Sequence, residues 1–337
     1  MKRTAAVFAL AALLVACGDG NPFVTTDSGS STDPDPTAPT TPTDPTTPTD
    51  PTAVPALIAN DLESISFNAA TNTLTVTGLS QDGVPLVNEY RHVTTSFVDG
   101  YETFTGQNDP LGRHATAFVA SRDGVQAGVV MTGPQFNTFF GGTFFERTGD
   151  YVAPTAPESR FDVTYYGNYA AGLNTRGPAT DIFSTPGVDP NVDTPAQTAY
   201  IRGLMFINVD LNDMSVEGEI YNRTAVIGNG TTDDTLTPAL LDLPDIVLVD
   251  GTLTGEGTFS GNIEQDESDP DFPIDGATDI GDFAGVIGGS EGEFVAGGTT
   301  VSDFTDSFDG EIEYGVFVLD LCVDGNTDPI CVNALQP

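Results

Sequence analysis

Apolar and polar residues alternate along much of this chain, beginning at Leu62. The segment Leu62–Phe67 alternates, and Thr73–Thr77 does so again after the polar stretch Asn68–Asn72. Successive side chains of a strand point to opposite faces of a sheet, so a period of two is typical of half-buried β-strands. Two such runs joined by turn-forming residues predict a β-hairpin.

Short strands of the same kind continue to the C-terminal region. They are expected at Thr116–Ala120, Gly128–Thr132, Gly142–Glu146, Phe161–Tyr166, Tyr200–Asp210, Met214–Tyr221, Gly251–Ile263, Gly281–Ile287, Gly292–Gly297 and Ile312–Asp320. No long window shows the period of an amphipathic helix. The chain is therefore expected to be all-β.

The second half has the pattern of a closed sheet. About eight short strands with hairpin turns predict an antiparallel eight-stranded barrel within residues 156–337. Residues 57–155 are expected to form a separate, smaller β domain before it. The chain supplies no helices to cover sheet edges, and closure removes those edges. Glycines within Phe283–Gly289 are interpreted as bends of a small barrel.

Five segments of the second half resemble a known family by their order. They are Tyr166-Gly-Asn-Tyr169, Gly218-Glu-Ile-Tyr221, Gly257-Thr-Phe-Ser-Gly261, Phe283-Ala-Gly-Val-Ile-Gly-Gly-Ser-Glu-Gly-Glu-Phe294 and Gly315-Val-Phe317. The order resembles the barrel of transferrin-binding protein B and its surface-lipoprotein relatives. In that family a Gly-x-Phe-x-Gly strand precedes a Gly-x-Phe-Tyr-Gly-Pro signature and a closing Gly-Val-Phe strand.

The resemblance implies one lobe with a handle and a barrel, where members of the family usually have two lobes. It also implies a protein that captures a solute or a protein, iron-bearing ligands included, for a TonB-type receptor. In place of the Tyr-Gly-Pro element this chain has Ala284-Gly285-Val286. No segment matches the ligand-contacting loops of the family, so the ligand-binding residues stay unknown.

The first residues have the order of a bacterial lipoprotein signal peptide. The apolar run Ala5–Val15 follows a basic start and is shorter than the about 20 residues that span a bilayer, so residues 1–16 are interpreted as a signal peptide. Leu14-Val15-Ala16-Cys17 resembles a lipobox, which makes Cys17 the lipidation site and the first mature residue. Gly18, the residue after this cysteine, resembles the sorting signal for the outer membrane in bacteria that sort lipoproteins by this position. The alternative is an ordinary secretory signal with a chance cysteine.

Residues 17–56 are expected to form a disordered tether after the lipidated cysteine. Thr41–Thr46 repeats unchanged as Thr47–Thr52. Pro, Thr and Asp cannot build a core, and Pro-rich chains extend by about 3.1 Å per residue. Such a tether could hold a folded body up to roughly 100 Å from the bilayer. A spacer that drifts in length has the same physical consequence.

The charge of the chain excludes one class of partner. Its formal net charge is -39. Nucleic-acid binding through phosphates requires basic patches, so no nucleic-acid partner is expected. The acidic surface either attracts cations or a basic partner, or maintains solubility as in acid-rich proteomes.

Two of the three cysteines remain after lipidation. An exported chain meets oxidising conditions, so Cys322 and Cys331 are expected to form a disulfide across a turn-rich hairpin. Closing a loop of this size is worth roughly 2.5–3 kcal/mol in the chain-entropy model. A metal site is the competing interpretation, but two thiols without a nearby histidine make a poor one.

Candidate chemistry is sparse, and neither catalytic nor metal-ligating residues nor a cofactor are assigned. His92 and His114 are the only histidines and lie in no ligand-spaced cluster. No Gly-x-Ser-x-Gly element surrounds a serine. The acid-rich stretch Glu264–Asp282 lacks the order of an EF-hand loop, and a solvated loop and weak calcium binding both stay open.

Aromatic residues gather in two segments. These aromatic residues are Tyr165, Tyr166 and Tyr169 in one segment, and Phe139, Phe140, Phe144 and Phe145 in the other. They either line a ligand cleft or supply core and cross-strand pairs, and the second role is the commoner one for aromatics at alternating positions.

These observations together predict an outer-membrane, lipid-anchored protein that binds a solute or a protein for a partner transporter and is not an enzyme. The body faces either the periplasm or the cell exterior. The alternative function is a non-catalytic envelope or adhesion protein with no solute ligand.

The lipobox assignment predicts the outcome of Cys17→Ser. Without a thiol to acylate, this variant should keep its signal peptide and move from the membrane fraction to the soluble fraction, because several acyl chains at about 0.8 kcal/mol per buried CH₂ hold the anchor. Cell fractionation and intact-mass spectrometry measure both effects. Normal cleavage and membrane retention of the variant would reject lipidation.

Overall fold

The computed structural model describes the body of the chain. The described residues are 53–68, 70–78, 86–94, 97–107, 113–134, 138–156, 161–180, 196–228, 238–267, 269, 272, 278–305 and 310–334. The chain divides into the units Met1–Thr47 and Pro48–Pro337. The signal peptide at 1–16, the lipidation site at Cys17 and nearly all of the tether lie outside the described residues.

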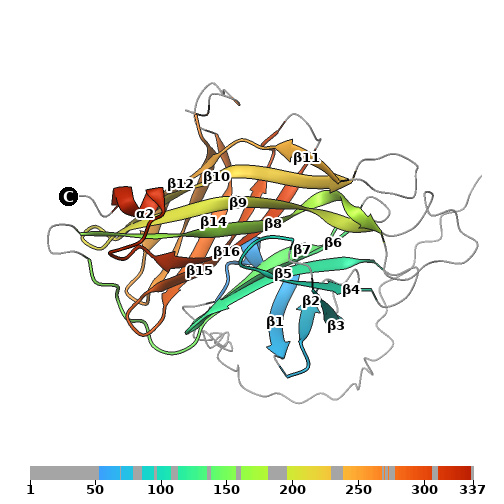
Figure 1. The fold of residues 1–337 in the computed structure, drawn as a ribbon, viewed down its shortest axis with the longest axis horizontal. Coiled ribbons are helices and arrows are strands. Elements are labelled where there is room, and N and C mark those ends of the chain that lie inside the picture. The colour runs from blue at the N-terminus through green and yellow to red at the C-terminus, as the bar shows by residue number, and fades with distance from the viewer. Residues whose placement is uncertain are drawn as a thin grey trace, which may run out of the picture. The chain divides into compact units, whose positions relative to one another are not determined.

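The first half forms a seven-stranded antiparallel sheet in which each strand pairs with the next (Figure 1). Its strands are β1 (Leu62–Asn68), β2 (Thr73–Gly78), β3 (Leu86–Val93), β4 (Glu102–Gly106), β5 (Ala115–Arg122), β6 (Val125–Thr132) and β7 (Gly141–Arg147). The short helix α1 (Ala56–Ala59) precedes β1. The expected hairpin is confirmed as β1–β2, in which Ile65 pairs with Val76 and both are buried.

The sheet curls until its two edge strands nearly meet. The amide N–H of Asp61 donates to the carbonyl of Gly141 at 3.2 Å, and the Asn60 side-chain amide donates to the same oxygen at 2.8 Å. In return the Gly141 N–H donates to the Asp61 carboxylate at 3.1 Å. These bonds tie the start of β7 to the residues before β1.

The second half closes into the predicted eight-stranded antiparallel barrel. Its strands are β8 (Asp162–Thr180), β9 (Ala196–Asp210), β10 (Ser215–Gly228), β12 (Ile246–Leu253), β13 (Thr258–Gln265), β14 (Asp279–Gly288), β15 (Phe294–Ser302) and β16 (Ile312–Leu321). The β9–β10 pairing, which begins at Asp210↔Ser215, completes the ring. The extra strand β11 (Pro238–Asp242) pairs with the end of β10 beyond β12.

Aromatic rings fill the barrel where the facing strand carries glycine. Phe259 pairs with Gly285, and Gly261 pairs with Phe283 on the same two strands. An added Cβ would lie 2.5 Å from the Phe259 ring at Gly285, and 2.6 Å from the Phe283 ring at Gly261. Gly297 faces Phe317 in the same way. These glycines therefore make room for rings.

The interpretation of the Phe283–Gly289 glycines as bends is thus wrong for Gly285. The β14–β15 register runs without a shift from Gly281 to Gly288, so this part of the strand is regular. The physical reason is space, because a side chain at Gly285 would overlap a ring from the neighbouring strand.

The sheet and the barrel share one apolar cluster. Phe118, Val129 and Phe145 of the sheet pack with small residues of the barrel wall, such as Ala170 and Ala284. The Thr143 hydroxyl donates to the carbonyl of Gly315 at 2.9 Å, and the Tyr101 hydroxyl lies 2.8 Å from the carbonyl of Asn168. The outer face of the barrel is therefore buried by the sheet on this side.

The C-terminal segment carries the disulfide Cys322–Cys331, with the Cα atoms 5.1 Å apart. The expected hairpin is wrong in form, because Cys331 lies in the short helix α2 (Pro329–Ala334). The Asp328 carboxylate accepts from the N–H of Ile330 at 2.9 Å, and proline at the first helical position suits a helix start. Among the described residues, no helix is long and apolar enough to cross a bilayer.

The packing of rings on glycines predicts the effect of Gly285→Ala. The added methyl group would meet the Phe259 ring and the Ala296 carbonyl, so the free energy of unfolding should fall by about 1–3 kcal/mol. Urea denaturation measures this change. Gly255→Ala is the matched control, because nothing lies within 4 Å of its Cβ position, and equal losses in the two variants would contradict the packing account.

Candidate functional site

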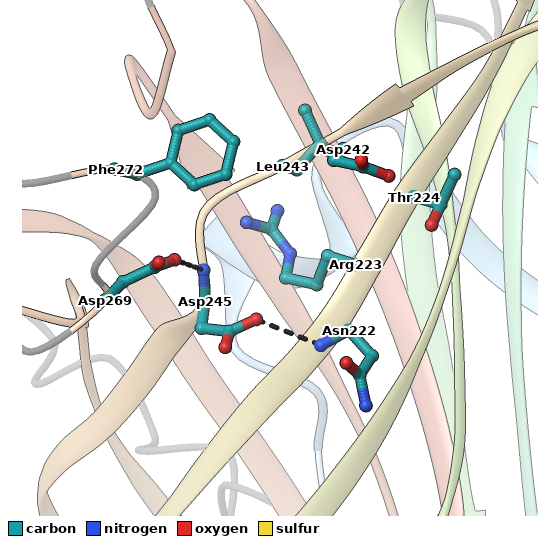
Figure 2. A pocket seen from close by; sticks show the side chains of 8 residues that line it. All are labelled: Asn222, Arg223, Thr224, Asp242, Leu243, Asp245, Asp269 and Phe272. Atoms are coloured by element: carbon teal, nitrogen blue, oxygen red, sulfur yellow. Dashed lines mark hydrogen bonds between the residues drawn. The ribbon is translucent and has the colours of Figure 1, made fainter.

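A pocket of about 320 Å³ opens in the barrel wall where β10 passes from pairing with β12 to pairing with β11 (Figure 2). Its lining residues are Asn222, Arg223 and Thr224 of β10, Asp242 at the end of β11, Leu243 and Asp245 before β12, and Asp269 and Phe272 after β13. The pocket therefore gathers residues from segments that are distant in the sequence.

An extra residue in β10 creates the floor of this pocket. Tyr221 pairs with Leu204 and Thr224 with Arg202, so three steps on β10 match two on β9. Asn222 has φ 51°, in the left-handed region that asparagine tolerates better than most residues. A bulge of this kind re-aims the side chains around it. Here it turns Arg223 inward, where regular alternation from the buried Ile220 would have placed Asn222.

Arg223 forms a buried ion pair with Glu313 of β16, and both side chains are fully buried. The Tyr169 hydroxyl donates to the other Glu313 oxygen at 2.6 Å. Burial, followed by the charge of Glu313, raises the pKa of Tyr169 well above its ordinary value, so Tyr169 stays a neutral donor. The guanidinium lies 4.9 Å from the Phe304 ring centre. A buried carboxylate is thus hydrogen-bonded on both oxygens.

The loop between β11 and β12 covers the same guanidinium. Arg223 Nη1 donates to the carbonyl of Pro244 at 2.5 Å, and the Leu243 N–H donates to the Arg223 carbonyl at 3.0 Å. The third nitrogen, Nε, is buried and has no hydrogen-bond partner among the described residues. Within the described part of the chain, one donor at the pocket is therefore unsatisfied.

Carboxylates form the wall beside this floor. The Asp245 carboxylate accepts from the Asn222 N–H at 2.9 Å, and the Asp245 N–H donates to Asp269 at 3.0 Å (Figure 2). The Gln265 side-chain amide donates to the Phe272 carbonyl at 3.2 Å. These bonds hold Asp245, Asp269 and Phe272 around the pocket.

The carboxylates repel one another. Burial raises the pKa of Asp245, and the charges of Asp269 and Asp266 add to that rise, while the Asn222 N–H and Arg223 oppose it. Burial also raises the pKa of Glu219 on β10, with further rises from Asp245, Asp266 and Asp269. The wall therefore carries an excess of negative charge.

The two histidines lie apart, His92 on β3 and His114 just before β5. The His92 ring pairs with the Glu102 carboxylate beside Phe104, near a smaller cavity of about 160 Å³. His114 is fully buried, and its Nε2 lies 2.5 Å from the Thr105 hydroxyl. In the described part of the chain, no three His, Cys, Asp or Glu side chains are placed to hold a metal ion.

The aromatic residues noted in the sequence do not converge on a cleft. Tyr165 and Tyr169 are buried in the barrel core, and the Tyr165 hydroxyl donates to the carbonyl of Gly292 at 2.6 Å. Phe145 is buried between sheet and barrel, while Phe144 packs inside the sheet. Their role as core residues is the one the structure supports.

Of the pocket residues, the sequence interpretation noted only Asp269 and Phe272, as members of the acid-rich stretch Glu264–Asp282. One further signal was present, since Arg223 is a cation on a strand between the apolar residues Ile220 and Ala225. A cation among core positions of a strand requires a buried partner, but its identity as Glu313 depends on barrel closure.

Of the comparisons with known proteins, the one with solved structures finds similar chains, and the two with family models and curated sequences do not. No protein-family model and no curated protein sequence matches the chain. A transferrin-binding protein B double mutant from Haemophilus parasuis Hp5 has 11% identity and a TM-score of 0.35, over 76% of this chain and 52% of that one. Intact Ap-TbpB, with N and C lobes, has 11% identity and a TM-score of 0.35, over 74% and 52%. The chain spans about half the length of both.

The carboxylate wall predicts a pH-dependent effect of Glu219→Gln. Because the folded-state pKa of Glu219 is raised, its protonation stabilises the fold, and this contribution is lost as pH rises through the raised pKa. The variant should therefore be more stable than the parent at pH 7 by a few tenths of a kcal/mol, with a smaller difference near pH 4.

Urea denaturation at the two pH values measures this difference. Glu217→Gln, at an exposed position on the same strand, is the control and should show no such pH dependence. A Glu219→Gln variant that is less stable at pH 7 would contradict the repulsion.

Proposed function

We propose that this chain is an outer-membrane lipoprotein, anchored through Cys17, whose β body binds a solute or a protein for a partner transporter and catalyses no reaction. The observation that carries the proposal is the filled barrel. Its interior holds fully buried rings such as Phe283 and Phe317 together with the Arg223–Glu313 pair. An eight-stranded barrel can either pack its interior or hold one small ligand, and this interior is packed.

A packed interior leaves recognition to the outside of the body. The sheet covers one side of the barrel wall, and the pocket at the β10 bulge opens on the wall. A rigid body with an external site suits a protein that holds its ligand where a second protein can reach it.

The sequence supplies the rest of the support. The lipobox-like Leu14-Val15-Ala16-Cys17 and the Pro/Thr/Asp tether suit a body displayed at a distance from the membrane. The order of glycine and aromatic motifs resembles that of transferrin-binding protein B. Because of this resemblance, the proposal includes a TonB-type receptor as the partner and an iron-bearing ligand. The name of that protein states that it binds transferrin, and no residue of this chain is assigned to that ligand.

The experiment uses the tagged full-length protein in its own cells. After crosslinking and solubilisation of the outer membrane, we expect it to copurify with a TonB-type receptor, and the Cys17→Ser variant to lose this partner. Protease digestion of intact cells reports whether the body is outside.

Two results would contradict the proposal. One is a lipidated, folded protein that yields no receptor, together with unchanged uptake of iron and other solutes when the gene is deleted. That result would favour an envelope or adhesion role. The other is equal receptor capture by the Cys17→Ser variant, which would show that anchoring plays no part.

A further inference from the structure

We propose that the pocket at the β10 bulge binds a neutral, hydroxyl-rich ligand such as a monosaccharide or disaccharide unit. The inference rests on the proposed binding function and names a ligand class for it. Two independent features of the pocket carry it: an unpartnered donor at the floor and carboxylate acceptors on the wall.

The donor is the Nε–H of Arg223. The side chain extends from β10 into the space between Leu243 and Asp245 (Figure 2). It is 1% exposed, and its other two nitrogens are engaged by Pro244 and Glu313. A buried donor without a partner is costly, so a ligand or a water molecule is expected to supply an acceptor here.

The acceptors are the carboxylates of Asp242, Asp245 and Asp269. The Asp245 carboxylate accepts the Asn222 N–H on one oxygen, and a carboxylate has further acceptor sites on its two oxygens. The Asp269 carboxylate accepts the Asp245 N–H and lies beside it in the wall. Asp242 is exposed at the end of β11. A hydroxyl group both donates and accepts, so adjacent hydroxyls of one ligand can accept from Arg223 and donate to the wall.

The charges favour a neutral ligand. Three carboxylates on the wall repel an anion, and the charge of Arg223 is already balanced by Glu313. A cation that reached the floor would meet the guanidinium of Arg223. A zwitterionic amino acid is also disfavoured. Its carboxylate would be repelled by the carboxylates of the wall, and the single free N–H of Arg223 cannot form the bidentate contact that carboxylates prefer.

The size and the aromatic edge agree with this class. A volume of about 320 Å³ lies at the lower end of the range for small-molecule sites, which suits one or two sugar rings. Phe272 lies at the edge of the pocket and can cover the apolar face of such a ring, while its backbone is held by Gln265.

The test is titration of the full-length protein with maltose, galactose and N-acetylglucosamine, followed by saturation-transfer NMR and calorimetry. Glycine, lysine and calcium chloride are titrated in parallel. We expect at least one saccharide to bind, with affinity reduced at least tenfold in Asp242→Ala and in Phe272→Ala. Glu217→Ala, an exposed carboxylate on β10, is the matched control and should bind as the parent does.

Circular dichroism confirms that each variant is folded. The proposal is overturned if the folded parent binds none of the saccharides, if it binds lysine, glycine or calcium in their place, or if Glu217→Ala weakens binding as much as Asp242→Ala. Receptor capture without saccharide binding would overturn this inference and leave the proposed function standing. Saccharide binding without receptor capture would support this inference and contradict the proposed function.

Discussion

The buried pair of Arg223 and Glu313 is the interaction on which the barrel and its pocket depend. Removing two charges from water is costly, and the attraction between them compensates only when their remaining donors and acceptors are also satisfied. Tyr169 of β8 supplies a partner for Glu313, and Pro244 before β12 supplies one for Arg223 Nη1. Among the described residues, the Nε of Arg223 is left without a partner. Strands β8, β10 and β16 and the β11–β12 loop are therefore joined at one point inside the barrel.

The same constraint explains why the pocket lies where it does. The bulge at Asn222 that turns Arg223 inward also coincides with the exchange of β12 for β11 along β10. The wall therefore opens beside a buried charge. Elsewhere, rings packed on glycines such as Gly285 and Gly297 fill the interior.

The alternation of side chains predicted the local pairings well. The β1–β2 hairpin and the β9–β10 pair, with its turn at 211–213, follow from period-two patterns joined by turn residues. Strands β3, β4 and β11 were missed because they are short or carry charged residues at the positions where alternation would be recognised. The single strand expected at Gly251–Ile263 is wrong, because residues 254–257 separate the end of β12 from β13. Cys331 was expected in a hairpin, but local capping by Asp328 favours a helix.

The candidate site could not be predicted from the sequence for a different reason, which is that its residues are far apart along the chain. Arg223 and Glu313 are 90 residues apart, and Asp269 reaches Asp245 only because β12 and β13 are neighbours. A local pattern cannot report such distances. It also cannot show that Asn222 has a positive φ, which decides whether Arg223 or Asn222 points inward.

The most direct measurement is a double-mutant cycle on the buried pair, read by urea denaturation. Arg223→Met leaves Glu313 buried without its counter-charge, and this should lower the free energy of unfolding by about 3–5 kcal/mol, whereas Arg223→Met combined with Glu313→Leu should recover most of that loss. If the two single losses simply add in the double variant, or if Arg223→Met costs less than about 1 kcal/mol, the pair does not hold the barrel together.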